Sequence, residues 1–242
     1  MPVGFIDLNA DLGESYGRWR LGDDAALLPL ITSANVACGF HGGDPLTMRR
    51  TVAMAAELGV IIGAHVSYPD LVGFGRREMD VEPGELEADV LYQVSALDGI
   101  SRVAGTSVRY VKPHGALYHR VLNDARQAEA VVSAVRKYST GLSVMVMAGT
   151  ALARGARDAG LRVIHEGFAD RAYTVDGLLV PRTEPEAVHT DPSVITEQAV
   201  RLARDGIVDS ICLHGDTPGA VQNAEAVRAT LGAAGIEVRS FI

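Results

Sequence analysis

Residues 35–44 read NVACGFHGGD, an apolar run that ends at a histidine set among glycines. Three other stretches end in the same way, and they are VIIGAH at 60–65, VRYVKPHG at 108–115 and SICLHGD at 210–216. Each pattern predicts a short strand that carries an imidazole at its carboxyl end. Active sites of α/β proteins lie outside the carboxyl ends of parallel strands, so these four histidines are expected to share one site. They are His41, His65, His114 and His214.

Length and composition indicate a single α/β domain over residues 1–242. Hydrophobic residues make up 48% of the chain, enough for a large buried core, and 26 glycines allow many tight turns. The formal net charge of −8 argues against nucleic acid or an anionic membrane as a partner. The first residues lack a signal-peptide pattern, and no apolar run reaches the roughly 18 residues of a membrane span, so we expect a cytoplasmic protein.

Strands and helices are expected to alternate along the whole chain. The predicted strands are residues 3–8, 31–38, 60–64, 108–112, 143–148, 161–165, the segment that ends at His214, and 236–241 as an eighth strand or an edge strand. The predicted helices are 25–30, 45–58, 82–104, 124–138, one that stops near Gly160, 193–204 and a last one after Gly219. This alternation favours a (β/α) barrel of seven or eight parallel strands, with an open doubly wound sheet as the alternative.

Carboxylates are predicted to share the carboxyl-end rim with the histidines. They are Asp7, Asp11, Glu14, Asp44, Asp70, Asp170 and Asp216, while His165 lies one position earlier in its own unit. Asp44 has a second interpretation as the cap of the following helix. Imidazoles and carboxylates together suit Zn²⁺, Mn²⁺ or Fe²⁺, but they also suit general acid and base catalysis. The sequence therefore leaves a bound metal undecided.

The chain contains two lysines, and Lys112 lies at the predicted rim directly before Pro113 and His114. Its ammonium could hold a substrate carboxylate or a developing oxyanion, whereas a Schiff base would require a lowered pKa. Arg77 and Arg171, from the two longest loops, could add anion contacts. No phosphate-binding loop of the GxxxxGK[ST] type occurs, so any ATP is not held by such a loop of this chain.

The two cysteines, Cys38 and Cys212, lie at predicted strand ends rather than in loops. We expect them to be small buried hydrophobic side chains, with a catalytic thiol as the less favoured alternative.

Five motifs resemble those of the LamB/YcsF family, and the resemblance extends over essentially the whole chain. They are DLNADLGE at 7–14, NVACGFHGGD at 35–44, GAHVSYPD at 63–70, VKPHGALY at 111–118 and EGFADR at 166–171. The resemblance implies a barrel related to the polysaccharide-deacetylase type. It also implies one component of 5-oxoprolinase, which opens 5-oxoproline (pyroglutamate) to L-glutamate with ATP and Mg²⁺ beside B and C subunits.

With this resemblance, we expect Lys112 and an arginine to bind the substrate carboxylate or a phosphorylated oxygen, while imidazole and carboxylate pairs move protons. The expected catalytic residues are Asp11, Glu14, His41, His65, Lys112 and His114. The expected substrate-binding residues are Asn9, Arg77, Asp170, Arg171, His214 and Asp216. Two alternatives stay open, a stand-alone metal-dependent amide or sugar deacetylase and a ligand-binding regulatory subunit without activity of its own.

Overall fold

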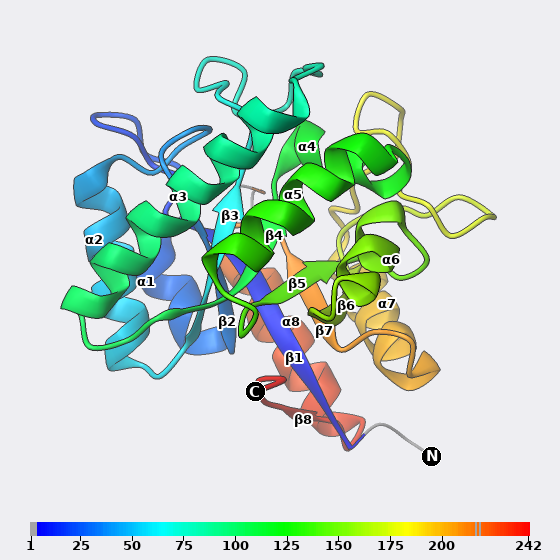
Figure 1. Cartoon of the computed structure of the whole chain (residues 1–242). Coiled ribbons are helices and arrows are strands. Elements are labelled where there is room, and N and C mark those ends of the chain that lie inside the picture. Colours follow the sequence, from blue (N-terminus) through cyan, green and yellow to red (C-terminus); the bar gives the residue numbers. More distant parts are fainter. Residues whose placement is uncertain (1–3, 216, 218) are drawn as a thin grey trace.

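The computed structural model describes residues 4–215, 217 and 219–242, which form a closed parallel barrel surrounded by helices (Figure 1). The barrel strands are β1 (Phe5–Leu12), β2 (Ser33–Ala37), β3 (Ile61–Val66), β4 (Val108–Pro113), β5 (Ser143–Val146), β6 (Arg162–Phe168) and β7 (Ser210–Leu213). Each strand pairs in parallel with the next one along the chain, and β7 pairs with β1 to close the barrel. Closure confirms the predicted barrel and excludes the open sheet.

The predicted eighth strand, β8 (Glu237–Val238), is an edge strand and not part of the barrel wall. It pairs with Phe5–Ile6, at the amino end of β1. In Figure 1 this pairing lies at the lower end of the molecule, near both termini. The loops that follow β3 and β6 extend from the opposite, upper side, where the carboxyl ends of the strands lie.

Helices follow the strands as the alternating pattern predicts. They are α1 (Asp24–Leu27), the 3₁₀ turn η1 (Leu28–Leu30), α2 (Pro45–Glu57), α3 (Pro83–Val103), α4 (Gly115–Asn123), α5 (Ala125–Tyr138), α6 (Ala151–Asp158), α7 (Pro192–Asp205) and α8 (Ala220–Ala233). The Asp44 carboxylate accepts hydrogen bonds from two backbone N–H groups at the start of α2, which confirms the predicted cap. Helix α4, which begins directly after His114, was not predicted. In the described part of the chain, no helix combines the length and apolar character that crossing a membrane requires.

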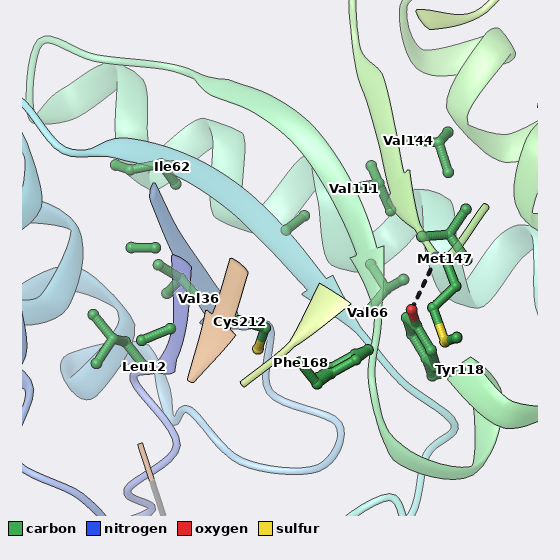
Figure 2. Close-up of a cluster of buried hydrophobic side chains, with 14 of the residues drawn as sticks. Leu12, Val36, Ile62, Val66, Val111, Tyr118, Val144, Met147, Phe168 and Cys212 are labelled. Atoms are coloured by element: carbon green, nitrogen blue, oxygen red, sulfur yellow. Dashed lines mark hydrogen bonds between the residues drawn. The ribbon is translucent and has the colours of Figure 1, made fainter. Parts of the chain in front are cut away.

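The apolar core lies between the barrel wall and the surrounding helices. Successive side chains of a strand point to opposite faces, and every second residue of β1 from Ile6 to Leu12 belongs to this core. Figure 2 shows core residues from several strands together with Tyr118 of α4, whose hydroxyl accepts a 3.0 Å hydrogen bond from the backbone N–H of Met147. Cys38 and Cys212 are both buried, as the sequence predicts.

The other face of β1 fills the barrel interior with polar side chains. Asp7, at the lowest level, accepts a 2.7 Å hydrogen bond from the Ser33 hydroxyl. One level higher, the Asn35 amide donates to Asn9 Oδ1 at 2.7 Å and to Asp11 Oδ1 at 2.9 Å. The prediction that Asp7 lies at the rim is wrong, because Asp7 is near the start of a strand that continues to Leu12. Asp11, near the carboxyl end of this strand, does reach the mouth of the barrel.

Candidate active site

Lys112 lies at the carboxyl end of β4 with its ammonium inside the barrel, and 2% of its side chain is exposed. The Nζ atom is 2.8 Å from Glu166 Oε2 and 3.5 Å from Asp11 Oδ1. It also donates to Asn9 Oδ1 at 3.3 Å and to Cys212 Sγ at 3.1 Å. The ammonium is therefore enclosed by groups from three other strands, β1, β6 and β7.

The charge of Lys112 is fixed by these neighbours. Burial alone would lower the pKa of Lys112, but Asp11, Cys212 and Glu166 outweigh burial and raise it well above the ordinary value of lysine. Burial likewise opposes ionisation of Asp11, yet Lys112 and His65 hold the pKa of that carboxyl well below its usual range. A Schiff base needs a neutral amine, so this environment favours an electrostatic role for Lys112.

Three imidazoles and a carboxylate form a second buried cluster beside Asp11. His41 Nε2 is 3.2 Å from Glu14 Oε1, and His114 Nδ1 is 3.6 Å from the same oxygen. His65 Nε2 is 3.1 Å from His114 Nδ1 and 3.3 Å from Asp11 Oδ1. These side chains come from the ends of β1, β2, β3 and β4, so the barrel brings together groups that are far apart in sequence.

Glycines allow the surrounding loops to approach this cluster closely. A Cβ atom on Gly42 would lie 2.6 Å from the Glu14 carbonyl oxygen. Gly75 has a φ of +64°, and a Cβ atom there would lie 2.8 Å from His114 Cδ2. Larger residues at these two positions would push the loops away from the imidazoles.

The imidazoles of His41 and His114 are kept neutral by their surroundings. Burial, together with the neighbouring His65, lowers the pKa of His41 well below the ordinary value of histidine. Burial, His41 and His65 lower the pKa of His114 in the same way. Neutral imidazoles can accept a proton or bind a metal ion through a free nitrogen lone pair.

The fourth predicted histidine, His214, is paired with a carboxylate on the other side of Asp11. Its Nδ1 lies 2.9 Å from Asp170 Oδ2, which also accepts the backbone N–H of His214 at 3.1 Å. Although burial opposes ionisation, His214 keeps the pKa of Asp170 below its usual value. His214 Nε2 is 4.0 Å from Asp11 Oδ2. Asp11 therefore lies next to Lys112, His65 and His214.

A pocket opens above Lys112 and Asp11, and most of the charged groups that line it are basic. Arg76, Arg171 and Arg182 line it together with His119 and Lys112. Burial and the nearby Arg182 lower the pKa of Arg171 to about 10. Burial, with Arg171 and Arg182, lowers the pKa of His119 to about 4. A cationic pocket in a chain with a net charge of −8 is suited to an anionic ligand.

The two arginines that the sequence singled out have different surroundings. The Arg77 side chain pairs with Asp70 and is 66% exposed, outside the pocket lining, whereas its neighbour Arg76 lines the pocket. Arg171 lines the pocket, but two of its nitrogens donate to the carbonyl oxygens of Ala187 and Val180 in the loop after β6. Substrate binding by Arg77 and Arg171 stays a prediction.

Two other predicted residues, Asn9 and His165, are not among the described residues that line the pocket. Asn9 lies one level below the pocket and donates through Nδ2 to the Ser210 hydroxyl at 2.7 Å. His165 lies in the middle of β6, because this strand continues to Phe168 and is longer than predicted, so His165 is not part of the histidine site. Asp216 lies outside the described residues.

Sequence reasoning missed several residues of the site. Glu166 contacts Lys112, and Arg182, Tyr118 and Phe168 line the pocket. A signal for Glu166 was present, because a glutamate inside an apolar strand needs a buried partner. Arg182 carried no such signal, since it lies in a long loop whose path the sequence does not specify.

The LamB/YcsF family pattern matches residues 6–242. The chain is 57% identical to the 5-oxoprolinase A subunit of Streptomyces avermitilis, over 98% of this chain and 99% of that protein. It is 54% identical to a 5-oxoprolinase A subunit of Agrobacterium fabrum, over 98% and 97% of the two chains. These alignments leave almost no part of either chain unmatched.

Solved structures agree with this similarity. The lactam utilization protein of Thermus thermophilus is 44% identical, with a TM-score of 0.93 over 98% of this chain and 100% of that chain. A family 4 carbohydrate esterase from Streptomyces lividans is 14% identical, with a TM-score of 0.53 over 97% of this chain and 91% of that chain. The second similarity concerns the fold alone, and it agrees with the expected relation to deacetylase barrels.

Proposed function

Because the chain belongs to the LamB/YcsF family, we propose that it is the A subunit of a 5-oxoprolinase, which opens the lactam of 5-oxoproline to L-glutamate with ATP hydrolysis. The observation that carries this proposal is the similarity to proteins of that name over nearly the full length of both chains. The pocket supports it, because it combines cationic groups with buried imidazoles and carboxylates. The cationic groups can bind an anionic cyclic amide, and the imidazoles and carboxylates can transfer the protons of its hydrolysis.

The basic groups of the pocket would bind the anionic parts of the substrate. 5-Oxoproline carries a carboxylate, and Arg76, Arg171 or Arg182 would form charge-assisted hydrogen bonds with it. Lys112 would face the lactam carbonyl or its phosphorylated oxygen, because the ammonium lies at the base of the pocket and stays charged. An ammonium fixed in place stabilises negative charge that develops on that oxygen.

The neutral imidazoles would move the protons of the reaction. Attack by water on the carbonyl carbon requires a base to take a proton, and the leaving nitrogen of the lactam must receive one. His65 and His114 line the pocket, and His65 Nε2 lies 3.1 Å from His114 Nδ1, so a proton can pass between the two rings. Asp11 and Glu14 would orient these rings, and His41 would act through Glu14.

A lactam is an unreactive amide, and phosphorylation of its carbonyl oxygen by ATP would make it open readily. The chain lacks a phosphate-binding loop motif, so we assign ATP with Mg²⁺ to the complex with B and C subunits. His214 and Asp170 would then contact the substrate from the side of β6 and β7. We place this complex in the cytoplasm.

The proposal is tested by measuring glutamate formed from 5-oxoproline and ATP, first with this chain alone and then with its B and C subunits. We expect glutamate and ADP only in the mixture. Amide or acetyl-sugar hydrolysis by the chain alone, without ATP, would support the deacetylase alternative, for which the imidazole cluster is a specific argument. Binding of 5-oxoproline without turnover in the full mixture would indicate a regulatory role.

A further inference from the structure

Two imidazoles of the cluster are oriented by backbone carbonyl groups. His65 Nδ1 lies 3.1 Å from the carbonyl oxygen of Lys112, and His114 Nε2 lies 2.9 Å from that of Phe74. A carbonyl oxygen can only accept, so both of these nitrogens carry a proton. The pKa of His114 is well below the ordinary value of histidine, because the ring is buried beside His41 and His65, so its opposite nitrogen, Nδ1, presents a lone pair.

The inward-facing atoms of this cluster lie at short distances from one another. His65 Nε2 and His114 Nδ1 are 3.1 Å apart. Glu14 Oε1 lies 3.6 Å from His114 Nδ1, and Asp11 Oδ1 lies 3.3 Å from His65 Nε2. A cation among these buried nitrogen and carboxylate oxygen atoms would stabilise such a cluster.

We propose that Glu14, His65 and His114 bind one divalent transition-metal ion. Tetrahedral ligands at about 2.0–2.1 Å from Zn²⁺ are roughly 3.3–3.4 Å apart, close to the 3.1 and 3.6 Å separations of the ligand atoms here. Two imidazoles and one carboxylate are a ligand set that proteins use for zinc and iron. The carbonyl oxygens that hold the two rings are the outer partners that metal-binding histidines require.

His41 belongs to the same cluster, but we assign it a positioning role. The four residues offer ligand atoms that all lie within 4.8 Å of one another. However, the His41 and His114 rings are stacked, with centroids 3.7 Å apart and planes 4° from parallel. An imidazole binds a metal ion in its own ring plane, so these two rings cannot both point at one ion. His41 Nε2, at 3.2 Å from Glu14 Oε1, is placed to hold the carboxylate.

The site borders the pocket, so a bound ion would lie next to a ligand there. His65, His114 and Asp11 line the pocket as well as the cluster. A metal ion in such a place polarises a carbonyl oxygen or lowers the pKa of a bound water. The binding proposal rests on the cluster alone and holds whichever reaction the complex performs.

The test is Zn²⁺ titration of the full chain after treatment with a chelator, by calorimetry and by competition with a chromophoric chelator. We expect one equivalent with a Kd below about 1 µM, and a visible spectrum of tetrahedral type when Co²⁺ replaces Zn²⁺. His65→Ala and His114→Ala should weaken binding more than about 100-fold, and His41→Ala about 10- to 100-fold. His119→Ala, a pocket histidine outside the cluster, is the matched control and should bind as the wild type does.

The wild-type chain alone can overturn the proposal, whether or not the variants fold. Absence of stoichiometric Zn²⁺ and Co²⁺ binding at micromolar concentrations would do so. Equal Zn²⁺ affinity of the wild type and the His65→Ala or His114→Ala variant would also overturn it, provided that circular dichroism shows the variant to be folded. Metal binding with no glutamate from the full complex would contradict the proposed function and leave the metal site intact. Glutamate formation without metal binding would contradict the metal site and leave the proposed function intact.

Discussion

Two buried clusters meet at Asp11, and they differ in the source of their positive charge. On one side Lys112 brings a permanent ammonium to Glu166 and Asp11. On the other side three imidazoles and Glu14 converge, and the pKa values of His41 and His114 are lowered by burial, so this cluster has no permanent cation. The difference teaches that one cluster contains its own cation, whereas the other can receive one, either a proton during the reaction or the metal ion proposed above.

The largest effect is expected when the built-in cation is removed. Lys112→Met leaves Asp11 and Glu166 buried without their ammonium, which should lower stability by about 3–5 kcal/mol. Turnover of the reconstituted complex should fall at least about 10²- to 10³-fold, because the oxyanion loses its stabilising charge. Urea unfolding and glutamate release measure the two effects. Lys112→Arg, which keeps the charge, is the control for stability, and wild-type stability of Lys112→Met would contradict the described role of the ammonium.

A smaller effect is expected when one of the two carboxylates is neutralised. Glu166→Gln keeps Lys112 paired with Asp11, so the loss of stability should be about 1–3 kcal/mol. Turnover should fall about 10- to 100-fold, since the ammonium is less firmly held under the substrate. The exposed Glu225 provides the matched control Glu225→Gln, which should behave as the wild type does. Equal effects of the two substitutions would show that Glu166 does not position Lys112.

The two clusters were not equally visible in the sequence. The histidines could be predicted because each ends an apolar segment, and the parallel barrel brings all such ends to one mouth. Lys112 could be predicted from its place and from the scarcity of lysine. Its pairing with Glu166 could not, because a glutamate inside an apolar strand indicates only that it has a buried partner, and the register of β4 and β6 around the barrel decides which residue that partner is. The same applies to the stacking of His41 on His114.

The fold was predictable to a similar extent. The alternation of strands and helices was sufficient for the barrel, because few other architectures accommodate it. The extent of β6 was not predictable, and His165 was therefore misplaced at the rim. Helix α4 was missed because Gly115, which has a φ of +56°, is typical of a loop rather than of the first residue of a helix.

A comparison of two neighbouring arginines would show how far the cationic region extends. Arg76 lines the pocket, whereas Arg77 points to Asp70. If the pocket arginines bind the substrate carboxylate, Arg76→Ala should raise KM for 5-oxoproline about 10-fold, with a smaller change in kcat. Arg77→Ala should change KM less than about 3-fold. The opposite ranking in steady-state kinetics would support the substrate role that the sequence suggested for Arg77.

The smallest effect on activity is expected below both clusters, at Asp7, where a buried acid has neither an imidazole nor a close ammonium. Burial raises the pKa of Asp7 to about 6, although Ser210, Ser33 and Thr32 donate hydrogen bonds to it. The folded chain therefore retains a proton that the unfolded chain loses near pH 4, so Asp7 lowers stability as pH rises from about 4 through 6.

Asp7→Asn cannot ionise, and its stability relative to the wild type should rise by up to about 3 kcal/mol between pH 4 and pH 7. Urea unfolding at the two pH values measures this difference, and Asp205→Asn, at the end of α7, is the exposed control. A difference that does not change with pH would mean that Asp7 is ionised in the fold at pH 4. The Lys112 ammonium would then stabilise the charge of Asp7 as well as the charges of Asp11 and Glu166. Its effect would extend through the whole polar interior of the barrel.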